Sequence, residues 1–158
     1  MTYSKFIEQL KKFEGCRLKA YYDVGGTLTI GYGFTKSVID SLNENTTITQ
    51  ERADKLLKQI VKKYMNAVVN ECKHHNLMFT CNQILALTDF AYNCGIGAMQ
   101  NLLKQQSHEK IVEHLLMYNK VTINGYKTFS QGLANRRDFE AVLYNKKCSC
   151  NVPCSYRG

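Results

Sequence analysis

The chain has 158 residues with 44% hydrophobic residues, enough for one domain or for two small lobes that share a helix. Its first residues have a helical pattern with several lysines, and no apolar run is long enough for a signal peptide or a membrane span. We therefore expect a soluble protein of the cytoplasm. Its net charge of +8 predicts polyanionic partners, but charge alone does not choose between phosphate, nucleic acid, teichoic acid and anionic peptidoglycan.

The seven cysteines are an odd number and include no C-x-x-C pair, so a closed disulfide framework cannot contain all of them. Free thiols in a reduced compartment are the simplest expectation. Two groups have the residue types of a metal site but lack the paired spacing of structural zinc sites: Cys72, His74, His75 and Cys81, and Cys148, Cys150 and Cys154. We expect no metal in either group, and a disulfide within the second group once the protein reaches an oxidising periplasm.

Two elements are expected at the N-terminus. Apolar residues at helical spacing between a cap region at Thr2 and Ser4 and a glycine at Gly15 predict a short amphipathic helix, with Glu14 on its last turn. Residues 17–22 alternate in character, and turn residues and then a β-branched, aromatic run at 27–34 follow them. This pattern predicts a β-hairpin with Asp23 near its bend. The polar residues that follow leave room for a short strand that the pattern does not place.

The rest of the chain reads as mainly helical. Thr49 caps a long helix with a continuous apolar stripe, which spans roughly 35 Å at 1.5 Å per residue and can join two lobes. Three further helices are expected, from Thr80 or Asn82 to a break at 93–97, from 107 to 118, and from 130 to 144. The first of them is so apolar that it should lie at the centre of its lobe, and a loop containing Gly125, with room for strand-like pieces, should join the last two.

These elements predict one α+β domain over residues 1–145. It consists of a small N-terminal hairpin lobe at about 14–48, a linking helix at about 49–75 and a larger helical C-terminal lobe at about 80–145. Residues 146–158 form a cysteine-containing tail that we expect to be loosely ordered.

Glu14, Asp23 and Thr29 carry groups that glycoside hydrolysis can use. The reaction needs a proton donor for the leaving oxygen and, across the sugar, an anion that activates water or stabilises the oxocarbenium-like centre. A helix end, a turn and a returning strand this close in sequence can surround one cleft. Acidic residues at helix ends and turns are also common, so a purely structural role for both acids is the alternative.

The stretch from Glu14 to Asp23, E-G-C-R-L-K-A-Y-Y-D, followed by T-I-G-Y-G, resembles the active-site signature of the phage-type lysozymes, the endolysin family that includes the T-even phage enzyme (glycoside hydrolase family 24). Three further segments resemble the family in the same order, so the resemblance covers about residues 3–145: Ile48-Thr49, residues 90–97 and residues 132–140. The family implies a lysozyme-like fold and a muramidase that cleaves the β-1,4 bond between N-acetylmuramic acid and N-acetylglucosamine without a cofactor.

The resemblance assigns a role to each residue of the signature. Glu14 matches the general acid, Asp23 the carboxylate that helps to activate water, and Thr29 the hydroxyl that holds this water. Members with this threonine invert the anomeric centre, which implies carboxyl groups roughly 6.5 to 9.5 Å apart. To donate a proton near neutral pH, Glu14 needs a pKa above its ordinary value, which burial between the lobes would favour.

The resemblance also assigns residues of the C-terminal lobe. Tyr92 and Asn93 match cleft-lining positions that contact sugar rings; a core aromatic and a helix C-cap are the alternative for them. Arg136 matches the arginine that pairs with the acid, which would lower the pKa of Glu14 and oppose burial. Solvated charges on an amphipathic helix are the alternative for Arg136 and its neighbour Arg137.

The chain departs from the family pattern at supporting positions. Phe34 stands where the family usually has histidine, and Leu28 and Tyr118 stand where it often has tryptophan, of which this chain has none. We expect these departures to affect stability and sugar affinity more than catalysis.

The leading hypothesis is therefore a monomeric lysozyme, made without a signal peptide in a host cytoplasm and released by a separate membrane-permeabilising protein to act on peptidoglycan in the periplasm or wall. A toxin or effector with the same chemistry and a wall-binding protein without activity remain alternatives. A nucleic-acid-binding protein is disfavoured because the 21 basic residues are spread along the chain and no helix-turn-helix or RNP-like motif is present.

Overall fold

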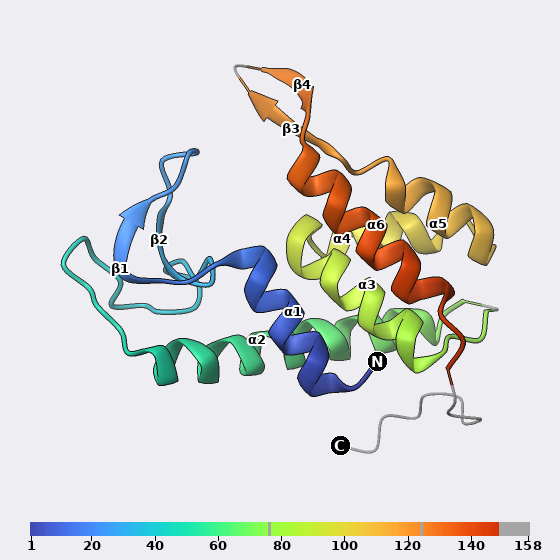
Figure 1. The fold of residues 1–158 in the computed structure, drawn as a ribbon, viewed down its shortest axis with the longest axis horizontal. Helices are drawn as coiled ribbons and strands as arrows, with labels where there is room; N and C mark the ends of the chain where they lie inside the picture. Colours follow the sequence, from blue (N-terminus) through green and yellow to red (C-terminus); the bar gives the residue numbers. More distant parts are fainter. Residues whose placement is uncertain (76, 124, 149–158) are drawn as a thin grey trace. The chain divides into compact units, whose positions relative to one another are not determined.

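The computed structural model describes residues 1–75, 77–123 and 125–148, within which it has six helices and two antiparallel hairpins (Figure 1). The chain forms two compact units. Residues 2–60 make up the N-terminal unit, and Met1 with residues from 61 onward makes up the C-terminal unit. This mixture of helices and small sheets confirms the predicted α+β class. The tail expected at the C-terminus lies, from residue 149, outside the described residues.

Helix α1 (Tyr3–Glu14) opens the N-terminal unit, as the apolar spacing predicts. The side chain of Thr2 accepts a hydrogen bond from the backbone N–H of Lys5, at 3.4 Å, and so caps the first turn. The helix ends at Gly15, which has a φ of 63° and donates its N–H to the Lys11 carbonyl. Caps therefore fix both ends of α1, and Glu14 lies at the end that Gly15 caps.

Strands β1 (Arg17–Tyr22) and β2 (Leu28–Gly31) form the predicted hairpin. The expected strand at 27–34 is too long, because the chain reverses after Gly31. Ile30 and Phe34 exchange both backbone hydrogen bonds, at 2.9 and 2.8 Å, around the three residues between them. β2 therefore ends at a tight turn.

The short strand that the sequence could not place is a brief pairing with β1. Ala20 donates its N–H to the Thr46 carbonyl and Ile48 donates to the Leu18 carbonyl, both at 2.9 Å. Only an isolated bridge between Lys19 and Thr47 results. It covers one side of β1 without a regular third strand.

Helix α2 (Gln50–Cys72) follows, and its 23 residues correspond to roughly 35 Å. The Thr49 hydroxyl accepts a hydrogen bond from the Arg52 N–H at 3.1 Å, which confirms the predicted cap. The boundary between the two units falls inside this helix, after Ile60. The predicted apolar stripe is largely buried: Ala53, Leu56, Leu57, Val61, Met65 and Val68. Among the described residues, no helix has the length and apolarity that crossing a bilayer requires.

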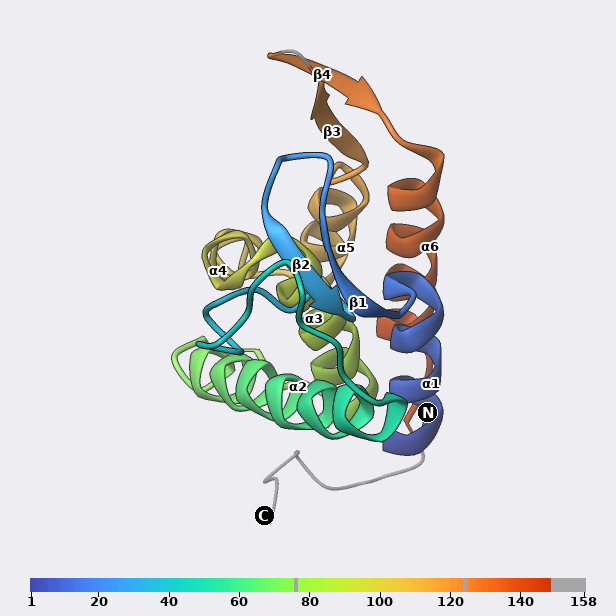
Figure 2. The same ribbon diagram turned by 90° about the vertical axis from the view of Figure 1, so that its left-hand side faces the viewer.

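The C-terminal unit is built around α3 (Cys81–Cys94), whose residues 84–91 are all buried, as expected. Thr80 rather than Asn82 caps it, since the Thr80 and Gln83 side chains bond reciprocally to the backbone in a capping box. Helix α6 (Gln131–Asn145) packs antiparallel to α3, because Asn82 at the start of α3 donates to the Lys146 carbonyl just after α6 (Figure 2).

The break expected at 93–97 is only a joint between two helices. Gly95, with a φ of 88°, ends α3, and α4 (Ile96–Leu103) begins at the next residue with Met99, Leu102 and Leu103 buried. Helix α4 was not predicted from the sequence. Helix α5 (His108–Leu116) is shorter than predicted by one residue at its start and two at its end.

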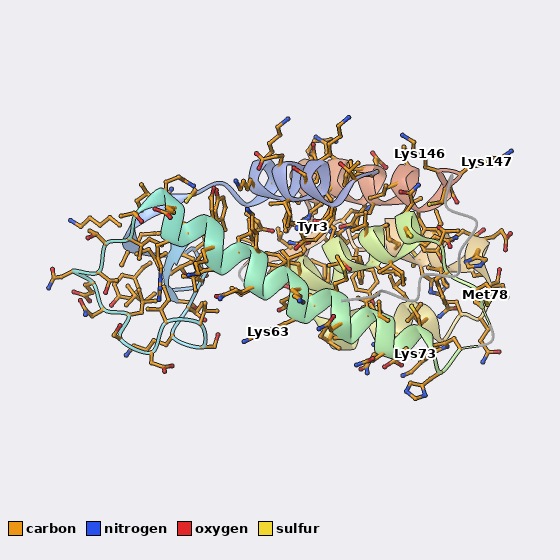
Figure 3. All side chains as sticks on the ribbon, turned by 90° about the horizontal axis from the view of Figure 1, so that it is seen from below. Tyr3, Lys63, Lys73, Met78, Lys146 and Lys147 are labelled. Atoms are coloured by element: carbon orange, nitrogen blue, oxygen red, sulfur yellow. The ribbon has the colours of Figure 1, made fainter. Side chains whose placement is uncertain are left out.

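The Gly125 loop contains the strand-like pieces that were expected. Strands β3 (Lys120–Ile123) and β4 (Tyr126–Phe129) pair along their full length and project from the helices of the C-terminal unit (Figure 1). Exposed lysines also occur elsewhere on this unit, and Figure 3 shows four whose side chains extend away from the helices: Lys63, Lys73, Lys146 and Lys147. The positive charge is therefore distributed over several elements.

One carboxylate joins three segments of the N-terminal unit. Asp54 of α2 accepts hydrogen bonds from Lys11 Nζ of α1 at 2.8 Å, from the Tyr32 hydroxyl at 2.7 Å and from Gln50 Nε2 at 2.7 Å. The bond from Lys11 is the main reason why the pKa of Asp54 lies below its ordinary value. Because Tyr32 lies in the turn after β2, this network links that turn to both helices.

Gly31→Ala should destabilise the protein by about 2 kcal/mol or more, because the new Cβ would lie 2.7 Å from the Phe34 ring at a φ of 64°. Gly97→Ala is the control, since nothing lies within 4 Å of its added Cβ and it occupies a helix, where alanine is favoured by up to about 1 kcal/mol. Urea unfolding measures both. Equal midpoints for the two variants would contradict the close approach of Phe34.

Asp54→Asn should lower the free energy of unfolding by about 1 kcal/mol at pH 7. Because the pKa of Asp54 is lower in the folded protein, its stabilisation is complete above the ordinary value of 3.8 and is lost as the pH falls through the folded value. The variant and the parent should therefore converge in urea unfolding below that pH. Asp40→Asn, at an exposed position, should change stability little at any pH.

Candidate functional site

Glu14 is the last residue of α1 and is half-buried. A Cβ added to Gly33 would lie 3.9 Å from Glu14 Oε2, so the carboxylate lies against the turn that follows β2. Gly33 has a φ of 86°, which favours glycine at this position. The T-I-G-Y-G segment therefore provides a turn without side-chain bulk next to the acid.

Asp23 lies where β1 enters the hairpin loop, and it is exposed. Its Oδ1 accepts hydrogen bonds from the backbone N–H groups of Gly25, at 2.9 Å, and Thr27, at 2.8 Å. Its own N–H donates to the Thr27 carbonyl at 3.0 Å. The carboxylate is thus held in place by the loop that it also stabilises.

Thr29 is buried, with 4% of its surface exposed, and its hydroxyl donates to the Thr27 carbonyl at 2.9 Å. Since this bond uses the hydroxyl proton, the lone pairs of the oxygen can accept a hydrogen bond from a water molecule. Thr29 pairs with Tyr21, and Asp23 lies two residues beyond Tyr21, so Asp23 and Thr29 are on the same face of the hairpin. The backbone of Thr27 is bonded to both.

The three candidate catalytic residues therefore belong to one unit and one short region. Asp23 lies at the start of the hairpin loop that leads into β2, Thr29 lies within β2, and Glu14 faces the turn after it. The two carboxylates thus lie toward opposite ends of β2, and Thr29 lies within that strand. Glycoside hydrolysis with inversion requires an acid and a base on the two sides of the sugar, with space for a water molecule beside the base.

The C-terminal unit carries the two predicted sugar-contacting residues at the end of α3. Tyr92 is half-buried, and its ring lies 5.4 Å from that of Tyr64 in α2 at an angle of 55°. Asn93 is exposed, and its Oδ1 accepts a hydrogen bond from Arg137 Nη2 at 3.0 Å. The alternative of a C-cap role for Asn93 is wrong, because Gly95 is the C-cap.

Arg136 binds Asp89 of α3 through two parallel hydrogen bonds, from Nε at 3.1 Å and from Nη2 at 2.9 Å. Arg136 and Arg137 are both buried, so the alternative of solvated surface charges is wrong for this pair. The predicted partnership of Arg136 with Glu14 would join residues of the two units and stays a prediction. Within its own unit, Arg136 anchors α6 to α3.

Sequence reasoning missed the buried cluster to which these arginines belong. Glu140 accepts a 2.6 Å hydrogen bond from Arg137 Nη2, and burial, together with the nearby Asp89 carboxylate, raises the pKa of Glu140 well above its ordinary value. Arg137 Nε and Glu140 Oε2 have no hydrogen-bond partner among the described residues. A lone acid in the apolar sequence of α3, and an Arg-Arg pair three and four residues before a glutamate in α6, were the available signals.

The described part of the chain contains no group of three or more histidine, cysteine or acidic residues that could hold a metal ion. Within it, four cysteines are free thiols, and burial raises the pKa of one of them, Cys72, to about 12. Cys148 is disulfide-bonded. The other two cysteines of the expected tail disulfide, Cys150 and Cys154, lie outside the described residues.

Comparison with known proteins identifies relatives among phage endolysins. An endolysin of Bacillus phage PZA is 33% identical over 150 residues, which cover 92% of this chain and 55% of the relative. An endolysin of Acyrthosiphon pisum secondary endosymbiont phage 1 is 31% identical over 145 residues, which cover 89% of this chain and 94% of the relative. The chain thus spans about half the length of the Bacillus phage relatives and nearly all of the other.

Solved structures agree with these relatives. An endolysin from Escherichia coli O157:H7 phage FAHEc1 superposes with a TM-score of 0.73 and 34% identity, covering 89% of this chain and 90% of that one. The muramidase domain of SpmX from Asticaccaulis excentricus superposes with a TM-score of 0.77 and 28% identity, covering 90% of this chain and 96% of that one. The family described as phage lysozyme matches residues 11–140. The chain therefore belongs to the phage lysozyme family, with the lysozyme-like fold that the resemblance implied.

Proposed function

We propose that the protein is a peptidoglycan hydrolase of the muramidase type, which cleaves the β-1,4 bond between N-acetylmuramic acid and N-acetylglucosamine. The observation that carries this proposal is the hairpin that holds the Asp23 carboxylate and the Thr29 hydroxyl on one face, next to the turn against which Glu14 lies. Membership of the phage lysozyme family and the names of the endolysin relatives support the substrate class.

In the proposed mechanism, Glu14 donates a proton to the glycosidic oxygen as the bond from this oxygen to the anomeric carbon breaks. A water molecule that donates a hydrogen bond to the Thr29 hydroxyl oxygen attacks the anomeric carbon from the opposite face of the sugar. Asp23 takes the proton that this water molecule loses. The configuration of the anomeric carbon is inverted. Exchange with solvent then returns a proton to the Glu14 carboxylate, and a solvent water molecule accepts the proton from Asp23.

Residues of the C-terminal unit would bind the sugar. The Tyr92 ring offers an aromatic face, and Arg137 occupies the Asn93 carbonyl oxygen, which leaves the amide N–H groups as donors to a sugar oxygen. Arg136 would pair with Glu14 and lower the pKa of the acid, which opposes the effect of burial.

The biological role that fits this chemistry is lysis of a bacterial host. The protein would act as a monomer, without a cofactor, on glycan strands in the periplasm or wall after release from the cytoplasm. A net charge of +8 would concentrate it on anionic wall polymer. A toxin or effector that uses the same reaction is the second candidate role, and a protein that binds the wall without cleaving it is the third.

Glu14→Gln should reduce the clearing of purified peptidoglycan by about 10²- to 10⁴-fold, because the amide has no proton of suitable pKa to donate. Glu8→Gln, the same change at an exposed position on the same helix, is the matched control and should keep full activity. Turbidity and the mass and anomeric form of the released fragments are measured.

Undiminished clearing by Glu14→Gln would remove Glu14 from its role as the acid. Fragments that retain the anomeric configuration of the glycan would contradict only the inverting mechanism and not the hydrolase activity. Binding of the parent protein to peptidoglycan without any fragments would favour the wall-binding role.

Asp23→Asn separates the chemical role of the carboxylate from its structural role. The amide oxygen can still accept the bonds from Gly25 and Thr27, so stability should be unchanged while turnover falls by about 10²-fold or more. Asp23→Ala should lose turnover and, in addition, about 1 kcal/mol of stability. Urea unfolding and clearing rates test both variants, and parental turnover in Asp23→Asn would make the residue a loop anchor only.

A further inference from the structure

The β3–β4 hairpin exposes several large apolar side chains. All four residues of β4 are exposed, and Tyr126 and Phe129 have 78% and 57% of their surface accessible. Ile123 at the end of β3 is 52% exposed. Neighbouring exposed apolar side chains on a narrow ribbon can mark a surface that binds a ligand.

The pairing register divides the hairpin into two faces. Lys120 is opposite Phe129 and Thr122 is opposite Lys127, so these four side chains share one face, which we term the lysine face. Ile123 is opposite Tyr126, and these two share the other face, termed the tyrosine face. The lysine face therefore combines one aromatic ring with two cations.

The lysine face is positively charged without compensation. The sequence contains no aspartate or glutamate between Glu113 and Asp138, and among the described residues neither lysine of this face makes an ion pair. Lys11, by contrast, is bonded to both Glu8 and Asp54. The face is thus suited to a ligand that brings its own negative charge.

The hairpin lies at the same end of the C-terminal unit as the predicted sugar-contacting residues. β4 leads directly into the N-cap of α6 at Ser130, and Arg137, two turns further on, is bonded to Asn93 at the end of α3 (Figure 1). A polymer that contacts Tyr92 and Asn93 could therefore continue toward the hairpin.

We propose that the lysine face is a second binding surface for the peptidoglycan glycan strand, an inference that rests on the proposed function. The Phe129 ring lies against the apolar face of a sugar, and Lys120 and Lys127 pair with carboxylates of the peptide stems. The surface lengthens the contact with the polymer beyond the bond that is cleaved. It forms and breaks no covalent bond.

Other occupants fit the lysine face less well. A second copy of this chain would carry the same charge of +8, and four side chains provide far less than the roughly 800 Å² per partner that stable interfaces bury. Teichoic acid would satisfy the lysines but offers no continuous row of sugar rings to the phenylalanine. A glycan strand with carboxylated stems uses both features.

The test measures binding to sacculi from which teichoic acid has been removed, in the Glu14→Gln background so that the wall stays intact. The double variant Lys120→Gln/Lys127→Gln should weaken co-sedimentation by about tenfold, because each exposed ion pair contributes up to about 1 kcal/mol, and added salt should reduce the difference. Phe129→Ser should weaken binding about threefold or more. Tyr126→Ser is the matched control, since it removes an exposed ring from the other face of the same hairpin, and it should bind like the parent.

Parental binding by the lysine variants, or an equal loss in Tyr126→Ser, would overturn the assignment of the lysine face. Binding that appears only when teichoic acid is present, or a concentration-dependent dimer that Phe129→Ser abolishes, would replace the glycan by another occupant. The proposed function is tested separately, by fragment release in the background with Glu14 intact. If the lysine variants still cleave a short glycan without peptide stems at the parental rate but clear intact wall more slowly, the second surface is supported independently of the catalytic residues.

Discussion

The Asp54 carboxylate is the interaction on which the N-terminal unit depends most. It accepts hydrogen bonds from Lys11, three residues before the acid on α1, and from Tyr32, the residue next to Gly33. Both neighbours of the Glu14 carboxylate, its own helix and the adjacent turn, are thus held by one group on α2. Burial, with the bond to Asp54, raises the pKa of Tyr32 to about 12, so the phenol remains a hydrogen-bond donor at neutral pH.

The C-terminal unit uses buried charge where the N-terminal unit uses half-exposed hydrogen bonds. Asp89, Arg136, Arg137 and Glu140 are all buried between α3 and α6. Removing four ionisable groups from water is costly, so the cluster is poor evidence of stability and better evidence of a specified geometry. Arg137 of this cluster donates a hydrogen bond to the Asn93 side-chain oxygen and so orients the amide. This orientation suits a residue that is proposed to bind sugar through its N–H groups.

The departures from the family pattern have local explanations. Phe34 is buried, and its ring lies 6.1 Å from that of Tyr32 and close to Gly31, so it fills the turn after β2 by packing rather than by an ion pair. Tyr118 meets the buried Phe90 ring edge to face at 4.9 Å, so an aromatic contact is present in this lobe without tryptophan. Phe34 and Tyr118 thus each place an aromatic ring in contact with another aromatic ring.

Features that depend on neighbouring residues could be predicted from the sequence: the end of α1 at Gly15, the long helix after Thr49 and the hairpin around Asp23. Caps, turns and apolar periodicity act within a few positions, whereas the choice of Thr2 over Ser4 as the cap of α1 needed the structure. The proposed catalytic residues were found from the same short stretch. The end of β2, the presence of α4 and the bond of Arg136 to Asp89, 47 positions away, became known only from the folded chain. Those outcomes depend on which distant groups packing brings within hydrogen-bond reach, and no local pattern carries that information.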